Sequence, residues 1–111
     1  MISVLCIDDE QEVRQLVVED FSEAGFVAYE ASNGRESLEL MISNWPDIMI
    51  CDITMPEMNG SELLADIQLN YPSLAGTPFI FLTALTDKGT MLEALRSGAD
   101  DYLTKPINFE S

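Results

Sequence analysis

The sequence contains no histidine, only two cysteines and only 5 basic residues among its 111 residues. Two thiols without histidine cannot complete the tetrahedral ligand set of a structural zinc site, which argues against such a site. Cys6 and Cys51 both lie within apolar runs. This placement favours buried free thiols in a reducing cytoplasm over a disulfide framework.

Positive charge is scarce, because 5 Lys and Arg stand against 20 Asp and Glu and give a net charge of −15 at pH 7. This balance argues against nucleic acid as a ligand, since basic residues that neutralise phosphates supply most of that affinity. It also argues against adhesion to anionic membranes. The apolar run at residues 1–7 is too short for a signal peptide or a membrane span.

The length and the apolar pattern predict a single α/β domain over residues 1–111. Five short apolar runs predict strands at residues 2–7, 27–31, 48–51, 79–82 and 102–103. The segments between them carry apolar stripes at helical spacing. These stripes are Val13, Leu16, Val17, Phe21 and Ala24; Leu38, Met41, Ile42 and Trp45; Leu63, Leu64, Ile67 and Tyr71; and Met91, Ala94 and Leu95. Repeated strand–helix alternation predicts a doubly wound parallel sheet with right-handed crossovers.

Several residues mark where the predicted helices begin and end. Gly25 and Gly98 stand where helices should stop. After Lys105 the chain could only begin a fifth helix at Asn108, so this helix is expected to be truncated or absent. Three residue pairs have capping-box spacing at helix starts, namely Asp9 with Glu12, Asn33 with Glu36, and Asn59 with Glu62.

Polar residues follow four of the five predicted strands, at the edge where doubly wound sheets bind ligands. They are Asp8, Asp9, Asp52, Thr83 and Lys105. Each alone has an ordinary explanation as a helix cap, a loop hydroxyl or a surface lysine. Together, three mutually repelling carboxylates favour a hard cation such as Mg²⁺. A carboxylate nucleophile, a metal, an ammonium group and a hydroxyl suit phosphoryl transfer to an aspartate.

Four segments resemble the motifs of receiver domains of two-component response regulators, the CheY-like superfamily. They are Ile-Asp-Asp-Glu at 7–10, Asp-Ile-Thr-Met-Pro-Glu-Met-Asn-Gly at 52–60, Leu-Thr-Ala at 82–84 and Gly-Ala-Asp-Asp-Tyr-Leu-Thr-Lys-Pro at 98–106. The resemblance covers the whole chain in order. It implies a flavodoxin-like sheet of five parallel strands in the order 2-1-3-4-5. It also implies a phosphorylation-dependent signalling switch that uses Mg²⁺, for which Mn²⁺ or Ca²⁺ could substitute, rather than an enzyme.

The resemblance implies which residues bind the metal and accept the phosphoryl group. Asp52 would be the phosphoacceptor. Asp9 and Asp52 would ligate Mg²⁺ directly, together with the backbone carbonyl of Thr54. Asp8 would act mainly through bound water.

The resemblance further implies which residues contact the phosphoryl group and respond to it. Lys105, the Thr83 hydroxyl and the backbone N–H of Ala84 would contact the phosphoryl oxygens. Tyr102 would change rotamer together with Thr83, although it is also explained as a half-buried strand aromatic. The bond before Pro106 would be cis, against a base rate of about 5–6% for such bonds.

The phosphoryl donor is expected to be a histidine kinase or a phosphotransfer protein, because this chain has no histidine. The chain is expected to be a piece of a longer response regulator or hybrid protein, acting on an output domain or a downstream protein. Without a fifth helix, apolar surface on residues 13–24 and on the fifth strand could support a homodimer.

Two other functions remain open at this point. One is a Mg²⁺-dependent phosphohydrolase with an Asp nucleophile. It is disfavoured because Thr54 stands where such enzymes carry a second Asp as general acid/base. The other is a receiver-like interaction module that is never phosphorylated. Its usual sign would be loss of Asp52, the acidic pair or Lys105, all of which are present.

Overall fold

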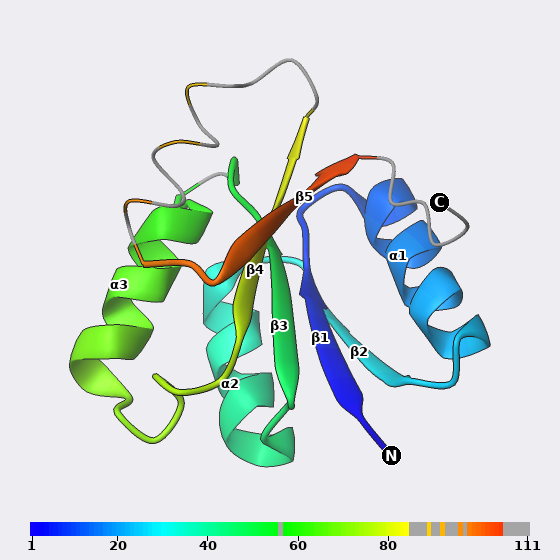
Figure 1. Ribbon diagram of the computed structural model, residues 1–111, viewed down its shortest axis with the longest axis horizontal. Coiled ribbons are helices and arrows are strands. Elements are labelled where there is room, and N and C mark those ends of the chain that lie inside the picture. The colour runs from blue at the N-terminus through cyan, green and yellow to red at the C-terminus, as the bar shows by residue number, and fades with distance from the viewer. Residues whose placement is uncertain (56, 85–88, 90–91, 93–95, 97, 106–111) are drawn as a thin grey trace.

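The computed structural model describes residues 1–111 except 56, 85–88, 90, 91, 93–95, 97 and 106–111. Strands and helices alternate along the chain, as the apolar pattern predicts (Figure 1). The elements are β1 (Ser3–Ile7), α1 (Gln11–Glu23), β2 (Val27–Ala31), α2 (Gly34–Asn44), β3 (Ile48–Asp52), α3 (Gly60–Asn70), β4 (Phe79–Ala84) and β5 (Asp101–Lys105).

The five strands form one parallel sheet in the order β2-β1-β3-β4-β5, which confirms the predicted flavodoxin-like fold. β1 lies next to both β2 and β3, so the chain winds away from it in both directions. The register pairs Ile7 with Ala31 and with Cys51, and it pairs Asp52 with Leu82. The carboxyl ends of these strands therefore lie at one edge of the sheet.

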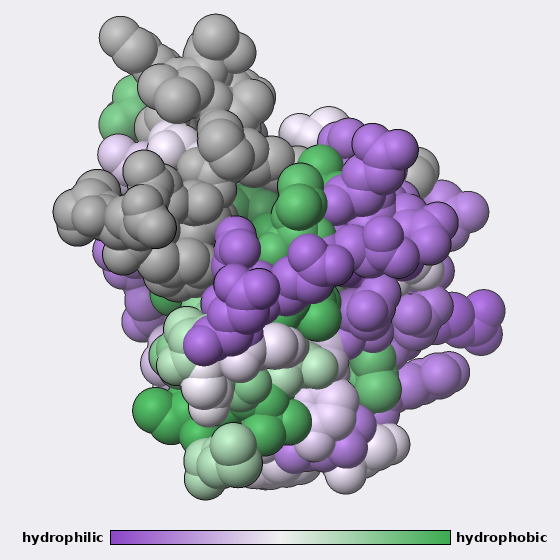
Figure 2. Space-filling view, turned by 90° about the vertical axis from the view of Figure 1, so that its right-hand side faces the viewer, coloured by the Kyte–Doolittle hydropathy of each residue, from purple (hydrophilic) through white to green (hydrophobic). Residues whose placement is uncertain are grey.

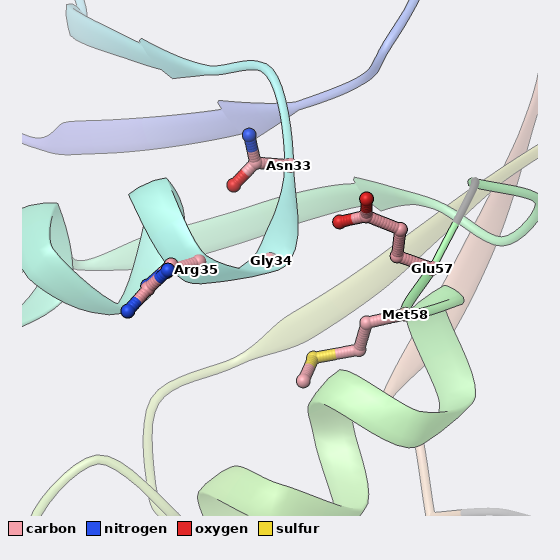
Figure 3. A pocket seen from close by; sticks show the side chains of 5 residues that line it. All are labelled: Asn33, Gly34, Arg35, Glu57 and Met58. Atoms are coloured by element: carbon pink, nitrogen blue, oxygen red, sulfur yellow. The ribbon is translucent and has the colours of Figure 1, made fainter.

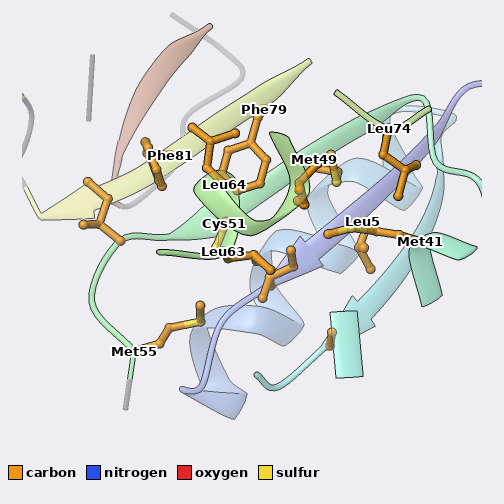
Figure 4. Packing of buried hydrophobic residues seen from close by; sticks show 14 residues of the cluster. Leu5, Met41, Met49, Cys51, Met55, Leu63, Leu64, Leu74, Phe79 and Phe81 are labelled. Atoms are coloured by element: carbon orange, nitrogen blue, oxygen red, sulfur yellow. The ribbon is translucent and has the colours of Figure 1, made fainter. Parts of the chain in front are cut away.

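The two faces of the sheet are covered by different helices, with α1 on one face and α2 and α3 on the other (Figure 1). Alternate strand residues pack toward opposite faces, as the two-residue period of a strand requires. The core beneath α2 and α3 is shown in Figure 4 and includes Leu5, Met41, Met49, Leu63, Ile67, Phe79 and Phe81. The smaller core beneath α1 consists of Val4, Cys6, Val17, Phe21, Ile50 and Leu82.

Two of the three predicted capping pairs are confirmed. At the start of α3 the box is complete, because Asn59 Oδ1 accepts from the Glu62 N–H at 2.9 Å and Glu62 Oε1 accepts from the Asn59 N–H at 3.2 Å. At the start of α2, Asn33 Oδ1 accepts from the Glu36 N–H at 2.8 Å. Both helices therefore begin where the sequence predicts, directly after an asparagine.

The third predicted capping pair, Asp9 with Glu12, is wrong. α1 begins one residue later than this pair requires, and its N-cap is Glu10, whose side chain makes no capping hydrogen bond. The stop of α1 is predicted correctly, because Gly25 follows its C-cap with φ +96°, in the left-handed region that favours glycine. Gly98 has φ +101°, but most of the helix that it was predicted to end lies outside the described residues, so this stop stays a prediction.

The predicted apolar stripes are only partly buried. Val17, Phe21 and Met41 are in the core, whereas Leu16, Ile42 and Trp45 are each more than half exposed. The buried side of α1 and of α2 is therefore narrower than the stripe on the sequence, whereas Leu63, Leu64 and Ile67 of the α3 stripe are all buried. The side of the molecule that carries α1 is covered by a broad hydrophilic band, and apolar side chains gather there in separate patches (Figure 2).

Several predictions fall on residues outside the described part of the chain. These are the fourth stripe at Met91, Ala94 and Leu95, the truncated fifth helix from Asn108, and the cis bond at Pro106. Within the described residues, no helix combines the length and the apolar character that crossing a membrane would need.

Candidate functional site

Three polar side chains are buried at the carboxyl edge of the sheet. Asp8 follows β1, Asp52 ends β3, and Thr83 lies in β4, with exposed fractions of 2%, 5% and 3%. Asp8 and Asp52 each come one position after the paired residues Ile7 and Cys51 of adjacent strands. Buried carboxylates are costly unless they are paired, so their position beside each other indicates a site rather than a structural cap.

Within the described part of the chain, the carboxylates of Asp8, Glu10 and Asp52 form a group that could hold a metal ion. One oxygen from each residue lies within 4.8 Å of the other two. Three carboxylate oxygens form a hard, anionic donor set, which suits Mg²⁺ and also Mn²⁺ or Ca²⁺. The donor chemistry therefore fits the metal that the sequence predicts.

Glu10 is a site residue that the sequence analysis did not identify. The turn after β1 is closed by Asp8 Oδ1, which accepts from the Glu10 N–H at 2.9 Å, and α1 begins at Gln11. This turn directs the Glu10 carboxylate back toward the sheet edge. Asp9, which the sequence predicted as a direct ligand, is exposed and is not a member of the group. Its ligand role stays a prediction.

The chain after Asp52 is held close to the sheet by backbone contacts. Asp52 Oδ1 accepts from the Thr54 N–H at 3.3 Å, and the Ile53 carbonyl oxygen accepts from the Gly60 N–H at 2.8 Å. A Cβ atom on Gly60 would lie 2.6 Å from the Phe81 ring and 2.8 Å from the Asp52 carbonyl oxygen. The absence of a side chain at Gly60 is therefore what lets α3 start directly beneath the phosphoacceptor candidate.

An open pocket of about 200 Å³ lies beside this loop (Figure 3). Asn33, Gly34 and Arg35 line it from the start of α2, and Glu57 and Met58 line it from the loop before α3. A Cβ atom on Gly34 would lie 2.8 Å from the Met58 sulfur, so the two walls are in close contact. Among the described residues, none of those predicted from the sequence to form the site lines this pocket.

The remaining predicted residues are placed by the backbone of the last two strands. Ala84 of β4 is paired with Lys105 of β5, and Thr83 with Thr104, at the same edge of the sheet as Asp52. This register brings the Lys105 backbone to the site edge; contact between its side chain and a phosphoryl group stays a prediction. Tyr102 is half-buried and packs against the core beneath α2 and α3.

Two buried thiols, Cys6 of β1 and Cys51 of β3, lie in the strands that lead to Asp8 and Asp52. Burial raises the pKa of Cys51 well above its usual value of 9, and the nearby charges of Asp52 and Asp8 raise it further. Burial also raises the pKa of Cys6 to about 12, with added contributions from the Glu30 and Asp8 charges. Both groups are therefore neutral thiols at physiological pH, and neither can act as a nucleophile at this edge.

Comparison with known proteins shows which family this chain resembles. A family model described as "Response regulator receiver domain" matches residues 4–111. The regulatory protein AtoC of Escherichia coli is 38% identical over 107 residues, which are 96% of this chain and 23% of AtoC. The response regulator SaeR of Staphylococcus aureus is 36% identical over 108 residues, which are 97% of this chain and 46% of SaeR. The chain thus spans less than half the length of these two curated relatives.

Solved structures show the same fold over nearly the whole chain. The Vibrio cholerae chemotaxis protein CheY4 has a TM-score of 0.87 and 32% identity, covering 97% of this chain and 89% of its own. The receiver domain of the Francisella response regulator 1452 has a TM-score of 0.83 and 35% identity, and the match covers 97% of this chain and 87% of that domain's chain.

Proposed function

Because this chain belongs to the response regulator receiver domain family, a family of signalling domains rather than classical enzymes, we propose that Asp52 is its phosphoacceptor. The observation that carries this proposal is the grouping of Asp8, Glu10 and Asp52 at the carboxyl edge. Two of these side chains are buried, which a cap or a solvated surface does not require. The phosphorylation-dependent switch is the function that this arrangement supports best.

In the proposed reaction, an Asp52 carboxylate oxygen attacks the phosphorus of a donor phosphohistidine. The new O–P bond forms as the N–P bond breaks, and the imidazole leaves with the bonding electron pair and takes up a proton. Asp52 is buried at the end of β3, so a donor has to approach it from the carboxyl edge of the sheet. A donor histidine has to lie outside these 111 residues, because they contain none.

The carboxylates of Asp8, Glu10 and Asp52 would hold the metal, with Asp9 and the Thr54 carbonyl as further predicted ligands. When bound, Mg²⁺ would neutralise the charge of the carboxylates and of the transferred phosphoryl group. Lys105 would supply a further positive charge at the same edge. Phosphorylation adds about −1.5 to −2 charges here, so this compensation is needed for the product to be stable.

The proposed response to phosphorylation is a population shift at β4 and β5. The Thr83 hydroxyl and the Ala84 N–H would turn toward the phosphoryl oxygens, and Tyr102 would move with them. The phosphate would act only through its different contacts with the two states. We further propose that the chain is a piece of a longer cytoplasmic regulator, with a histidine kinase or phosphotransfer protein upstream and an output domain or protein downstream.

The test is phosphorylation by a small donor, acetyl phosphate or phosphoramidate, with Mg²⁺, followed by intact-protein mass spectrometry. We expect one phosphoryl group on the wild type and none on Asp52→Asn. Asp47→Asn is the matched control, because Asp47 lies just before the same strand at the opposite edge and should leave labelling unchanged. Phosphate on another aspartate of Asp52→Asn would refute the assignment. Continuous release of phosphate at enzymatic rates would favour the phosphohydrolase instead.

A further inference from the structure

Arg14, in the first turns of α1, joins the acidic turn to the edge strand β2. Its Nη1 donates to the backbone carbonyl oxygen of Asp8 at 2.8 Å. Its Nε donates to Glu30 Oε1 on β2 at 2.9 Å. Only 13% of the Arg14 side chain is exposed, against 45% for Glu30. The guanidinium group is thus enclosed between the turn and the strand.

This pair differs from an ordinary surface ion pair, which contributes little to stability. An enclosed guanidinium group has lost much of its hydration, so its hydrogen bonds fix its neighbours more firmly than an exposed ion pair does. The planar guanidinium group offers two donors in a fixed geometry, one for each partner. A lysine has a single ammonium group at this reach and cannot make both bonds in the same way.

The residue whose carbonyl oxygen Arg14 contacts, Asp8, is also held by other hydrogen bonds. The Asp8 N–H donates to the Ala31 carbonyl oxygen at 3.1 Å, and Asp8 Oδ1 closes the turn to Glu10 at 2.9 Å. With the Arg14 contact to its carbonyl oxygen, Asp8 is therefore held through its N–H, its carbonyl and its side chain. Release of one of these bonds would let the turn rotate and would separate the carboxylates.

We propose that Arg14 is a positioning residue that holds the Asp8 main chain against β2, so that the carboxylates of Asp8 and Glu10 meet Asp52 in the arrangement that binds Mg²⁺. The inference rests on the proposed function for the role of the metal. It also makes a prediction about metal affinity that does not require phosphorylation.

Electrostatics alone predicts the opposite effect, which makes the inference testable. Arg14 is a cation close to a cation site, so removing its charge should by Coulomb's law strengthen Mg²⁺ binding. Weaker binding after removal of Arg14 therefore cannot come from the loss of its charge. Loss of groups that orient metal ligands typically weakens metal affinity about 10–100-fold.

The experiment measures the Mg²⁺ dissociation constant by isothermal titration calorimetry, well below the melting temperature of each variant. Arg14→Met keeps an apolar stem of similar length, and we expect its dissociation constant to rise about 10-fold. Arg14→Lys keeps the charge but not the two-donor guanidinium group. Its dissociation constant should therefore lie between those of the wild type and Arg14→Met. Arg35→Met removes an exposed arginine at the start of α2 and should bind Mg²⁺ like the wild type.

A second readout separates positioning from a purely structural role. The rate of labelling by phosphoramidate should fall in Arg14→Met at low Mg²⁺ and return to the wild-type rate at saturating Mg²⁺. Unchanged or tighter Mg²⁺ binding in Arg14→Met would overturn the inference, even if its melting temperature fell. If the wild type bound Mg²⁺ but took up no phosphate, the proposed function would fail while the calorimetric test of Arg14 remained valid.

Discussion

The two edges of the sheet use aspartate in opposite ways. At the amino edge, Asp47 and Asp100 are exposed, and each precedes a strand and accepts from the first residue of the neighbouring strand. The bonds run from the Ser3 N–H to Asp47 and from the Phe79 N–H to Asp100, both at 2.8 Å. At the carboxyl edge, Asp8 and Asp52 are buried together with Glu10 nearby.

The difference separates carboxylates that stabilise the fold from carboxylates that serve function. An aspartate that accepts a backbone N–H completes a hydrogen bond and fixes strand register at small cost. Carboxylates grouped within a few ångströms repel one another and lower the stability of the folded state unless a cation is bound. Replacing an aspartate at one edge should therefore change stability with the opposite sign to replacing one at the other edge.

The largest change in the free energy of unfolding is expected from a substitution that disturbs backbone packing at the carboxyl edge. Gly60→Ala would place a Cβ atom within 3 Å of Phe81 and of the Asp52 carbonyl oxygen, so the start of α3 must shift. We expect the free energy of unfolding to fall by about 3 kcal/mol. Gly76→Ala near the amino edge has nothing within 4 Å of the new Cβ atom and should change stability by less than about 0.5 kcal/mol. Urea denaturation measures both values, and equal losses of stability in Gly60→Ala and Gly76→Ala would contradict this prediction.

The next effect is a gain in stability at the carboxyl edge. Asp8→Asn removes one charge from the group and keeps an oxygen that can accept from the Glu10 N–H. Without Mg²⁺ we expect the free energy of unfolding to rise by about 2 kcal/mol, and with saturating Mg²⁺ this advantage should shrink or reverse. Thermal melts with and without Mg²⁺ measure both values. Loss of stability in the metal-free state would show that Asp8 is structural.

A smaller loss is expected at the amino edge. Asp47→Ala removes the acceptor of both the Ser3 N–H and the Ser3 hydroxyl, which it binds at 2.8 and 3.2 Å. Because these groups are exposed, water replaces part of the bond, and we expect a loss of about 1 kcal/mol that Mg²⁺ does not alter. Glu23→Ala is a control at another exposed acidic residue and should be close to neutral. If the stability change caused by Asp47→Ala depended on Mg²⁺, the proposal that only the carboxyl edge responds to the cation would be wrong.

The smallest effect at neutral pH belongs to the two thiols, which are uncharged there in both states. The unfolded thiols ionise near their usual pKa of 9, whereas burial raises the pKa of Cys6 to about 12 in the folded protein. Above pH 9 the unfolded state releases a proton that the folded state keeps, so stability should fall as the pH rises from 9 toward 12. Cys6→Ala should lose part of this slope in denaturation curves recorded across that range. An unchanged slope would contradict the raised pKa.

Local signals in the sequence predicted most of the fold correctly. Strands that are covered on both faces form continuous apolar runs, so β3 was located to within one residue. The bounds of the edge strand β2 were predicted to the residue. The Asn59–Glu62 box is equally local, because both of its bonds form within one helical turn. The runs at 79–82 and 102–103 were too short, because β4 and β5 continue into polar residues that pair with a neighbouring strand.

The unpredicted features depend on contacts between distant segments or on the path of a turn. Leu16 fits the helical stripe of α1 as well as Val17 does, and only the position of the sheet decides which of them is buried. Asp9 and Glu10 are neighbours with the same charge, so the sequence could not decide which carboxylate the turn directs inward. The bond from Arg14 to Glu30 joins a helix to a strand, and no local pattern indicates it.

The strictly parallel pairing of the strands also determines when the site can exist. Two adjacent parallel strands cannot be joined by a hairpin, so each pair can form only when the crossover segment that connects the strands is in place. Such non-local pairing slows folding, and it also keeps Asp8 and Asp52 apart until β1 and β3 have joined. The unfolded chain therefore has no preassembled cation site. Mg²⁺ should retard unfolding of the finished domain far more than it speeds the early steps of folding.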